Sequence, residues 1–161
     1  MWTDRVRRGW RGLREEMPAP LAPPDTYAAD DVAAMLRELG IAMVEVVQPT
    51  QLVRTRLHRV ARRYTTKDVR VVVLPTVLWI QIGTDSYEVA ASTRATTQLD
   101  LAGRVDHIAR LAAAGAIAPA DAVTALAAAR RMEPRFNSAV TVVGYVITTL
   151  GFSMIINPTW A

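Results

Sequence analysis

The last 26 residues of the chain, 136–161, contain no charged side chain. Within this run, residues 137–156 form an apolar stretch of 20 residues. An α-helix rises about 1.5 Å per residue, so the stretch is long enough to cross a hydrocarbon core about 30 Å thick. Pro158 ends the stretch, because a proline disfavours the helical conformation in the residue before it. The sequence therefore predicts one transmembrane helix over residues 136–158.

The residues before this helix predict its orientation. Residues 130–135 contain three arginines and one acidic residue. Positively charged residues beside a transmembrane helix stay on the cytoplasmic side. We therefore expect Arg135 at the cytoplasmic interface of the inner (plasma) membrane, and the part of the chain before Phe136 in the cytoplasm. Trp160 has an amphipathic ring suited to a membrane interface, and the lipid bilayer is the first expected partner.

The predicted helix has one face of small residues and one of large apolar residues. The small residues are Thr141, Gly144, Thr148 and Gly151. Because lipid provides no hydrophobic force between helices, small residues at helical spacing mark the face where another helix packs closely. We expect the neighbouring helices to belong to a longer membrane region of which this chain is a truncated part. Another subunit, or further copies in a homo-oligomer, are the alternatives.

Composition excludes several classes of protein. The 161 residues suffice for one soluble domain beside a transmembrane helix. The absence of cysteine excludes disulfides and thiolate metal sites. The net charge is +4, but the arginines are dispersed and no aromatic stacking platform accompanies them, so we expect no nucleic-acid partner.

Residues 1–29 predict a basic tail followed by a proline-rich linker. Trp2 and Trp10 share one arc of a helical wheel with other apolar residues, and arginines occupy the rest. Such an amphipathic helix can lie on an anionic membrane surface, with its tryptophans at the level of the headgroups. Gly9 and Gly12 disfavour a helix, so a disordered arginine-rich tail is the alternative.

Residues 30–133 have the pattern of a folded cytoplasmic domain. Apolar residues at helical spacing predict one helix that begins with Asp30 as its cap and a second helix after Pro49. Their expected core positions are Val32, Leu36, Leu39, Met43 and Val46 in the first, and Val53, Leu57, Val60 and Tyr64 in the second.

Three short runs rich in β-branched and aromatic residues follow, at 69–74, 77–82 and 87–91. The breaks between them are too short for a helical crossover, so we expect an antiparallel meander. Two further helices follow, the first closed by Gly115 as a left-handed cap and the second beginning at Pro119. The predicted class is α+β: a helix pair, a three-stranded antiparallel meander, a helix pair and one transmembrane helix.

Five stretches in this order resemble the threonine/serine exporter family, whose members join a cytoplasmic N-terminal domain to a membrane region of many helices. They are RTRLHRVARRY at 54–64, VVVLPTVLWI at 71–80, TQLDL at 97–101, AGAIAPADA at 114–122, and residues 143–158. The resemblance implies the cytoplasmic domain and first transmembrane helix of a secondary transporter. It also implies export of small amino acids, threonine and serine, with a dicarboxylate as the alternative substrate, and no cofactor.

Three residues are candidates for contact with a small amino acid. Arg94 and Asp100 have the charges that would pair with its carboxylate and its ammonium group, and Thr76 flanks a proline at a predicted strand turn. Ordinary turn chemistry is the alternative explanation for Thr76 and Arg94.

Two other classes of function compete with transport. A membrane-tethered hydrolase would use His58 or His107 with a serine such as Ser86, Ser92 or Ser138. Sequence spacing does not establish that any of these serines lies beside a histidine. We therefore expect both histidines to have surface or packing roles, the protein not to be an enzyme, and no metal site. The third class is a single-span adaptor that self-associates through Gly144 and Gly151.

Overall fold

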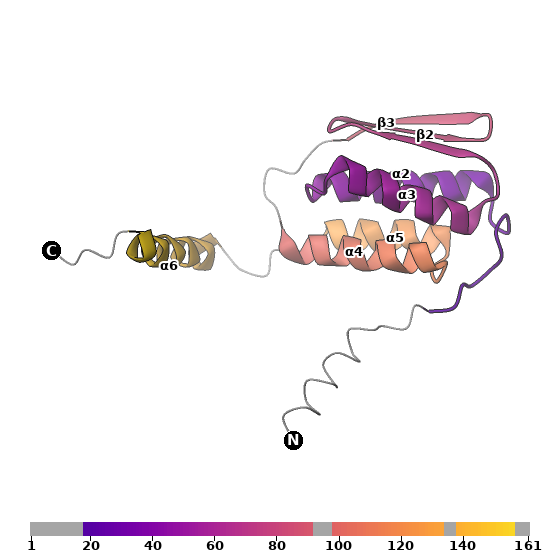
Figure 1. Ribbon diagram of the computed structural model, residues 1–161. Coiled ribbons are helices and arrows are strands. Elements are labelled where there is room, and N and C mark those ends of the chain that lie inside the picture. Colours follow the sequence, from indigo (N-terminus) through magenta and orange to yellow (C-terminus); the bar gives the residue numbers. More distant parts are fainter. Residues whose placement is uncertain (1–17, 92–97, 134–137, 157–161) are drawn as a thin grey trace, which may run out of the picture. The chain divides into compact units, whose positions relative to one another are not determined.

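The computed structural model describes residues 18–91, 98–133 and 138–156 of the chain (Figure 1). Its contacts divide the chain into two compact units, Met1–Arg131 and Met132–Ala161. Within the described residues, the first unit holds four helices and a three-stranded antiparallel sheet, and the second unit holds one long helix. These elements confirm the predicted α+β class with an apolar helix at the C-terminal side. Residues 1–17 of the predicted tail and linker, which include Trp2 and Trp10, lie outside the described residues.

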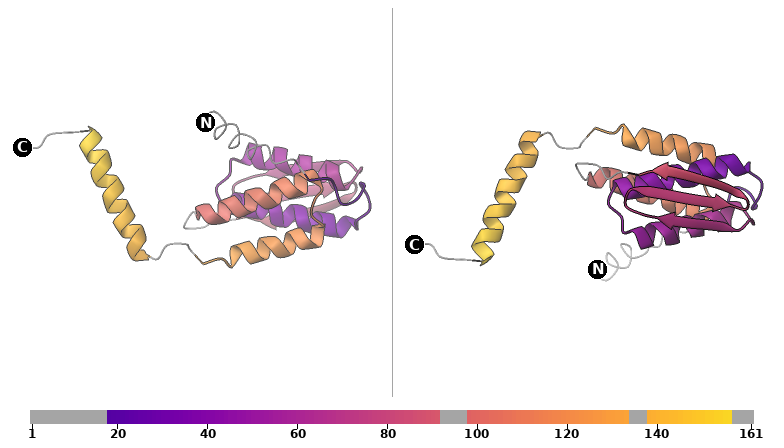
Figure 2. Two further views of the ribbon diagram at one scale, coloured as in Figure 1. Left: turned by 90° about the horizontal axis from the view of Figure 1, so that it is seen from below. Right: turned by 90° about the horizontal axis from the view of Figure 1, so that it is seen from above.

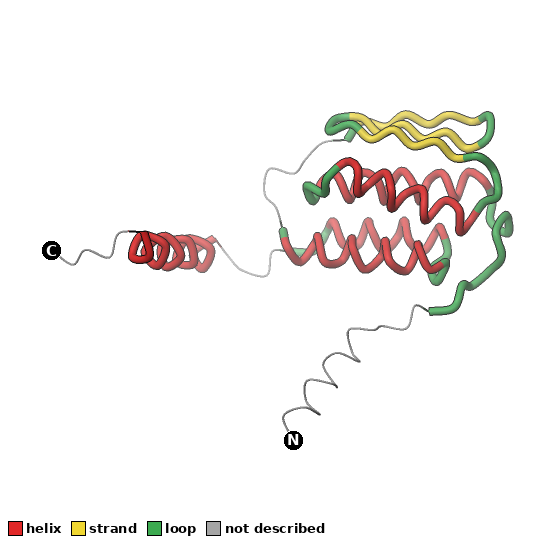
Figure 3. The backbone as a smooth tube through the Cα atoms, viewed as in Figure 1, coloured by secondary structure: helices red, strands yellow, loops and turns green. Residues whose placement is uncertain are grey.

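The first unit consists of three layers (Figures 1 and 3). The sheet forms one layer, α2 and α3 form the middle layer, and α4 and α5 form the third. Figure 2 shows the sheet over α2 and α3 from one side, and α4 with α5 from the other. The bounds are α2 Ala29–Glu45, α3 Thr50–Tyr64, β1 Val69–Val73, β2 Val77–Ile82, β3 Asp85–Ala90, α4 Leu99–Ala114 and α5 Pro119–Arg130.

Helix α2 is the centre of the unit. It contacts β2 on one side and α3, α4 and α5 on the others, and nine of its 17 residues are buried. Gly40 permits this close packing, because a Cβ atom there would lie 2.4 Å from a methyl carbon of Leu78. The prediction that Asp30 caps the helix is wrong, since the N-cap is Ala28. Asp30 lies in the first turn, where its Oδ1 accepts a hydrogen bond of 3.0 Å from the Tyr87 hydroxyl.

The sheet is the predicted meander, with strand order β1-β2-β3. Alternate residues of the central strand, Leu78, Ile80 and Ile82, are buried against the middle layer. Strand β3 begins at Asp85, two residues earlier than expected, because Ile82 pairs with Asp85 and only Gly83 and Thr84 form the turn. Gly83 has a φ of 59°, and a positive φ at the first turn position is typical of tight hairpins.

Helices α4 and α5 form a hairpin whose turn was predicted correctly. Gly115 is the left-handed cap of α4, with a φ of 73°, and Pro119 is at the start of α5. The turn is fixed to the middle layer, because the Tyr64 hydroxyl donates a hydrogen bond of 2.7 Å to the carbonyl of Ile117. Burial raises the pKa of Tyr64 to about 12, which favours the protonated hydroxyl that donates this bond. Helices α2 and α5 end, and α3 and α4 begin, at the same end of the unit (Figure 1).

The second unit is described through α6, which spans Ser138–Ile156. Residues 139–156 are all exposed, although this segment is apolar and long enough to cross a membrane. Among the described residues, α6 is the single helix with this combination of length and composition. The bounds of α6 agree with the predicted apolar stretch at 137–156 to within one residue at its start, and they coincide with it at Ile156.

Candidate membrane and ligand sites

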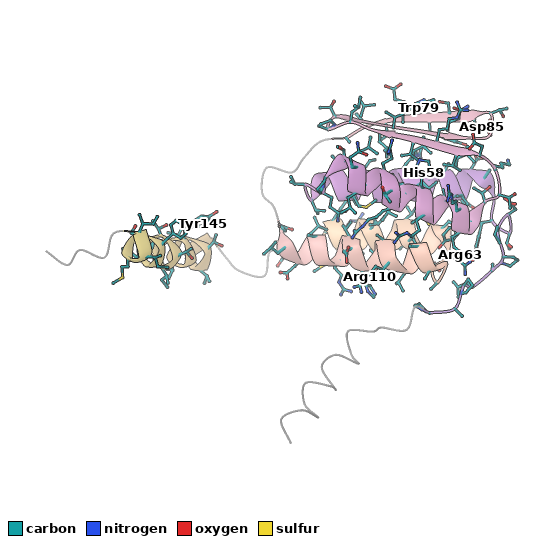
Figure 4. The ribbon with its side chains drawn as sticks, in the orientation of Figure 1. His58, Arg63, Trp79, Asp85, Arg110 and Tyr145 are labelled. Carbon is teal, nitrogen blue, oxygen red and sulfur yellow. The ribbon has the colours of Figure 1, made fainter. Side chains whose placement is uncertain are left out.

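One face of α6 is hollowed where its small residues lie. Thr141, Gly144 and Thr148, together with Val140 and Tyr145, line a shallow groove of about 390 Å³. A Cβ atom added at Gly144 or Gly151 would meet no other atom within 4 Å. Figure 4 shows Tyr145 on this helix. The groove leaves the backbone near Gly144 accessible to the close approach of a second helix.

The Thr148 hydroxyl in this groove is compatible with an apolar surrounding. The Thr148 hydroxyl donates a hydrogen bond of 2.8 Å to the carbonyl oxygen of Gly144 within the same helix. A hydroxyl satisfied in this way does not need water, which is the condition for placing threonine in lipid or against another helix. The helix therefore combines an open small-residue face with an internally satisfied hydroxyl.

Four residues are predicted to lie at the membrane interface. Arg135 and Trp160 lie outside the described residues, as Trp2 and Trp10 do. Their roles at the bilayer surface stay predictions.

The predicted ligand residues lie in different layers of the first unit. Thr76 is exposed in the turn between β1 and β2, and its carbonyl accepts a hydrogen bond of 2.8 Å from the Ala91 amide. Asp100 is exposed in the first turn of α4. The α2–α3 layer separates the sheet from α4, so the structure does not bring Thr76 and Asp100 together (Figure 1). Arg94 lies outside the described residues.

The two histidines lie on different helices and in different surroundings. His58 is half-buried on α3, in a basic groove lined by Arg54, Thr55, Arg59 and Arg62. Figure 4 labels His58 on α3, beneath the sheet.

His107 is exposed on α4. Ser86 is exposed on the outer face of the sheet, because it pairs with Gln81, which alternates with the buried Ile80 and Ile82. The sheet thus separates Ser86 from His58. Ser92 lies outside the described residues, and Ser138 begins α6 in the second unit. In the described part of the chain, no group of three His, Cys, Asp or Glu side chains could hold a metal ion.

An ion-pair cluster that the sequence did not reveal joins the end of α5 to α2. Arg130 donates from Nη1 to Glu38 Oε2 at 2.5 Å and from Nε to Glu45 Oε2 at 2.9 Å. The three side chains are only 21%, 31% and 17% exposed. Burial alone would lower the pKa of Arg130, but the two carboxylates raise it, so the guanidinium stays charged. Glu38 and Glu45 are seven residues apart on one helix face, which is the signal that sequence analysis missed.

A second cluster joins α3 to α4 near the middle of both helices. Arg56 Nη1 donates to Asp106 Oδ1 at 2.6 Å, and the other oxygen of Asp106 pairs with Arg110 at 3.3 Å. Arg56 also donates to the Gln48 side chain at 3.3 Å. Figure 4 shows Arg110 on the outer side of the α4–α5 layer. The two charged clusters therefore join α5 to α2 and α4 to α3.

Comparison with known proteins gives one family match that covers residues of both units. A family model with the description "Putative threonine/serine exporter" matches residues 34–161, which cover most of the first unit and all of α6. No curated protein and no solved structure matches the chain.

Proposed function

Because the chain belongs to the threonine/serine exporter family, we propose that it forms the cytoplasmic domain and first transmembrane helix of a secondary transporter. The transporter would export threonine and serine across the inner membrane. The observation that carries this proposal is the extent of the family match, which runs from α2 through α6 without leaving either unit out. The exposed apolar surface of α6 supports it, since such a helix needs lipid or other helices around it.

The transport path itself needs more helices than α6. Secondary transporters bind their substrate near the middle of the bilayer, between several helices, and one helix cannot enclose such a site. The groove along Thr141, Gly144 and Thr148 is the face through which α6 would join its companions. We therefore assign α6 to the periphery of the path or to its assembly, with further helices of the same or a partner chain completing it.

The first unit would act on the cytoplasmic side as a docking, gating or sensing domain. We propose that it receives small amino acids at the end where α4 begins, with Asp100 and Arg94 as the charged groups. Thr76 lies at the same end but in the sheet layer, so it would contribute from that layer and not through direct contact with Asp100. Loss of serine export in an Asp100→Asn variant would support this assignment, and unchanged serine export would oppose it.

Export of labelled amino acids tests the proposed function. Cells that lack the gene for this chain would be compared with cells that carry it and its neighbouring genes, after loading with labelled threonine, serine or succinate. We expect the gene to restore efflux of threonine and serine. Efflux of succinate alone, or no change in any efflux, would contradict the proposal.

A pair of matched variants ties the result to α6. Gly144→Ile with Gly151→Ile fills the small-residue face, so we expect it to abolish the restored efflux while the protein remains in the membrane. Val143→Phe with Val146→Phe adds the same number of side-chain carbons to the opposite face and should leave efflux close to the original rate. Equal activity of the two double variants would show that the small face is not an assembly surface.

A further inference from the structure

The exposed aliphatic side chains of the first unit are unevenly distributed. Its described residues include six exposed large hydrophobic side chains, and five of them lie at the end where α2 finishes and α3 begins. We call this the aliphatic end. Its residues are Val47, Leu52, Val72, Leu74 and Leu99, and the sixth exposed residue, Leu21, lies at the opposite end.

These residues come from all three layers of the unit. Leu74 belongs to the β1–β2 turn of the sheet, Val47 to the turn between α2 and α3, and Leu99 to the first residue of α4. They are 52%, 57% and 83% exposed, respectively. The register places Val72 beside Trp79 on the outer face of the sheet, where Figure 4 labels Trp79. The aliphatic end is therefore a broad surface and not a single groove.

The backbone at Val47 provides an independent observation. Val47 has a φ of 60°, in the left-handed region that favours glycine and that a β-branched residue rarely adopts. It follows the C-cap of α2, where glycine is the usual residue, and the Gln48 amide completes the turn by donating to the Met43 carbonyl at 3.0 Å. The unit thus holds a strained valine with its side chain in solvent. Strain of this kind points to a function for the side chain.

The aliphatic end is the end of the first unit from which the chain continues to α6. Arg130 at the end of α5 binds Glu45 at the end of α2, so α5 leaves the unit at the aliphatic end. Only seven peptide steps separate Arg131 from Ser138. With α6 in a bilayer, as the proposed function requires, the chain continues from this end of the unit to the transmembrane helix.

We infer that the aliphatic end rests on the cytoplasmic leaflet, with Val47, Leu74 and Leu99 in the headgroup region of the lipid. This inference rests on the proposed function and adds a surface to it. A planar lipid surface contacts side chains from three layers at once, whereas a partner helix in a groove contacts a single row. Exposed charged residues occur at both ends, with Asp100 and Arg131 at the aliphatic end and Lys67, Asp68 and Asp85 at the opposite end. The exposed aliphatic side chains are therefore what distinguishes the aliphatic end.

Lipid-borne quenchers test the inference on the complete chain. Because the chain contains no cysteine, single variants Val47→Cys, Leu74→Cys and Leu99→Cys can carry one environment-sensitive fluorophore each. The labelled chains would be reconstituted in phosphatidylethanolamine and phosphatidylglycerol vesicles with nitroxide groups on the headgroups or on the acyl chains. Leu21→Cys is the matched control at the opposite end, and Ile147→Cys reports insertion of α6. All five positions are exposed, so the labels do not disturb a core.

We expect headgroup nitroxides to remove most of the fluorescence at Val47, Leu74 and Leu99, and little of it at Leu21. Acyl-chain nitroxides should quench the label at Ile147. If Ile147 is quenched but the three labels resemble Leu21, the inference fails and the proposed function stands. Blue-shifted but unquenched labels would mean that protein covers this end and would also overturn the inference. If Ile147 itself is not quenched, α6 is not in the bilayer, and the proposed function fails as well.

Discussion

Helices α2 and α6 are similar in length but opposite in their surroundings. Helix α2 has 17 residues, nine of them buried inside the first unit, and a charged cluster joins it to α5. Helix α6 has 19 residues, and those from 139 to 156 are all exposed. The first unit therefore buries its own apolar side chains. The described part of the chain provides no such apolar environment for α6. Substitutions in the two helices should separate these two sources of stability.

The largest expected contrast comes from the same substitution in both regions. Leu57 is fully buried between the layers, so Leu57→Ala should cost about 3 kcal/mol through lost contacts and a residual cavity. Leu150 is 60% exposed on α6, and Leu150→Ala should change the stability of the first unit by less than about 0.5 kcal/mol. Urea unfolding in detergent, followed by near-ultraviolet circular dichroism, measures both. Equal losses would mean that α6 is part of the same core.

The next contrast concerns the charged cluster at the end of α5. Arg130→Met keeps the aliphatic stem but leaves Glu38 and Glu45 without their shared guanidinium, and we expect a loss of about 2 kcal/mol. Arg131→Met changes an exposed neighbour and should cost less than about 0.5 kcal/mol. The same unfolding experiment applies. A cost for Arg130→Met no larger than that for Arg131→Met would show that the cluster adds nothing to the attachment of α5.

Two glycines of the α4 region should respond in opposite directions. Gly115→Ala places a Cβ atom in a left-handed conformation and 2.9 Å from the Arg63 side chain, which should cost about 1.5 kcal/mol. Gly103→Ala adds a methyl group to open space within α4 and should stabilise the unit by about 1 kcal/mol. Thermal unfolding monitored at 222 nm would rank the variants. Stabilisation by Gly115→Ala would contradict the left-handed cap.

The smallest effect is a pH dependence in the loop before α2. Asp25 accepts hydrogen bonds from the hydroxyls of Thr66 and Thr65, and these bonds lower its pKa below the ordinary value of 3.8. The unfolded chain therefore binds a proton at higher pH than the folded chain does. The stability that these hydrogen bonds contribute is fully present above the pKa that Asp25 has in the unfolded chain. It is lost as the pH falls through the pKa that Asp25 has in the folded chain.

Asp25→Asn should consequently flatten the fall in stability between neutral and strongly acidic pH. Unfolding midpoints across that range would measure the slope, and Asp85→Asn, at the exposed start of β3, serves as a matched control. A slope unchanged by Asp25→Asn would remove Asp25 from the pH response.

Local patterns predicted much of the fold. The helical spacing of Val32, Leu36, Leu39 and Met43 identified the buried face of α2, because burial of that face is what selects the helix. Gly115 and Pro119 identified the α4–α5 turn because few residues tolerate those backbone positions. The start of β3 was missed, since Asp85 and Ser86 have low strand propensity and are held in the sheet by pairing with Ile82 and Gln81.

The candidate sites depended on contacts between distant segments. Arg130 is 92 residues from Glu38, so nothing local indicates that they meet. Thr76 and Asp100 are close in sequence, but the chain crosses from the sheet layer to the α4 layer between them. The small-residue face of α6 could be identified from the sequence because helical spacing alone defines it. Its partners, the ligand residues and the interface residues stay predictions.

The most direct test of the account is the sidedness of two single cysteines in the otherwise cysteine-free chain. Thr84→Cys lies in the exposed β2–β3 turn, and Ile147→Cys lies within α6. We predict that a membrane-impermeant maleimide labels Thr84→Cys in inverted membrane vesicles but not in intact cells, and labels Ile147→Cys in neither. Labelling of Thr84→Cys in intact cells, or of Ile147→Cys in a chain that washes off the membrane, would contradict the account.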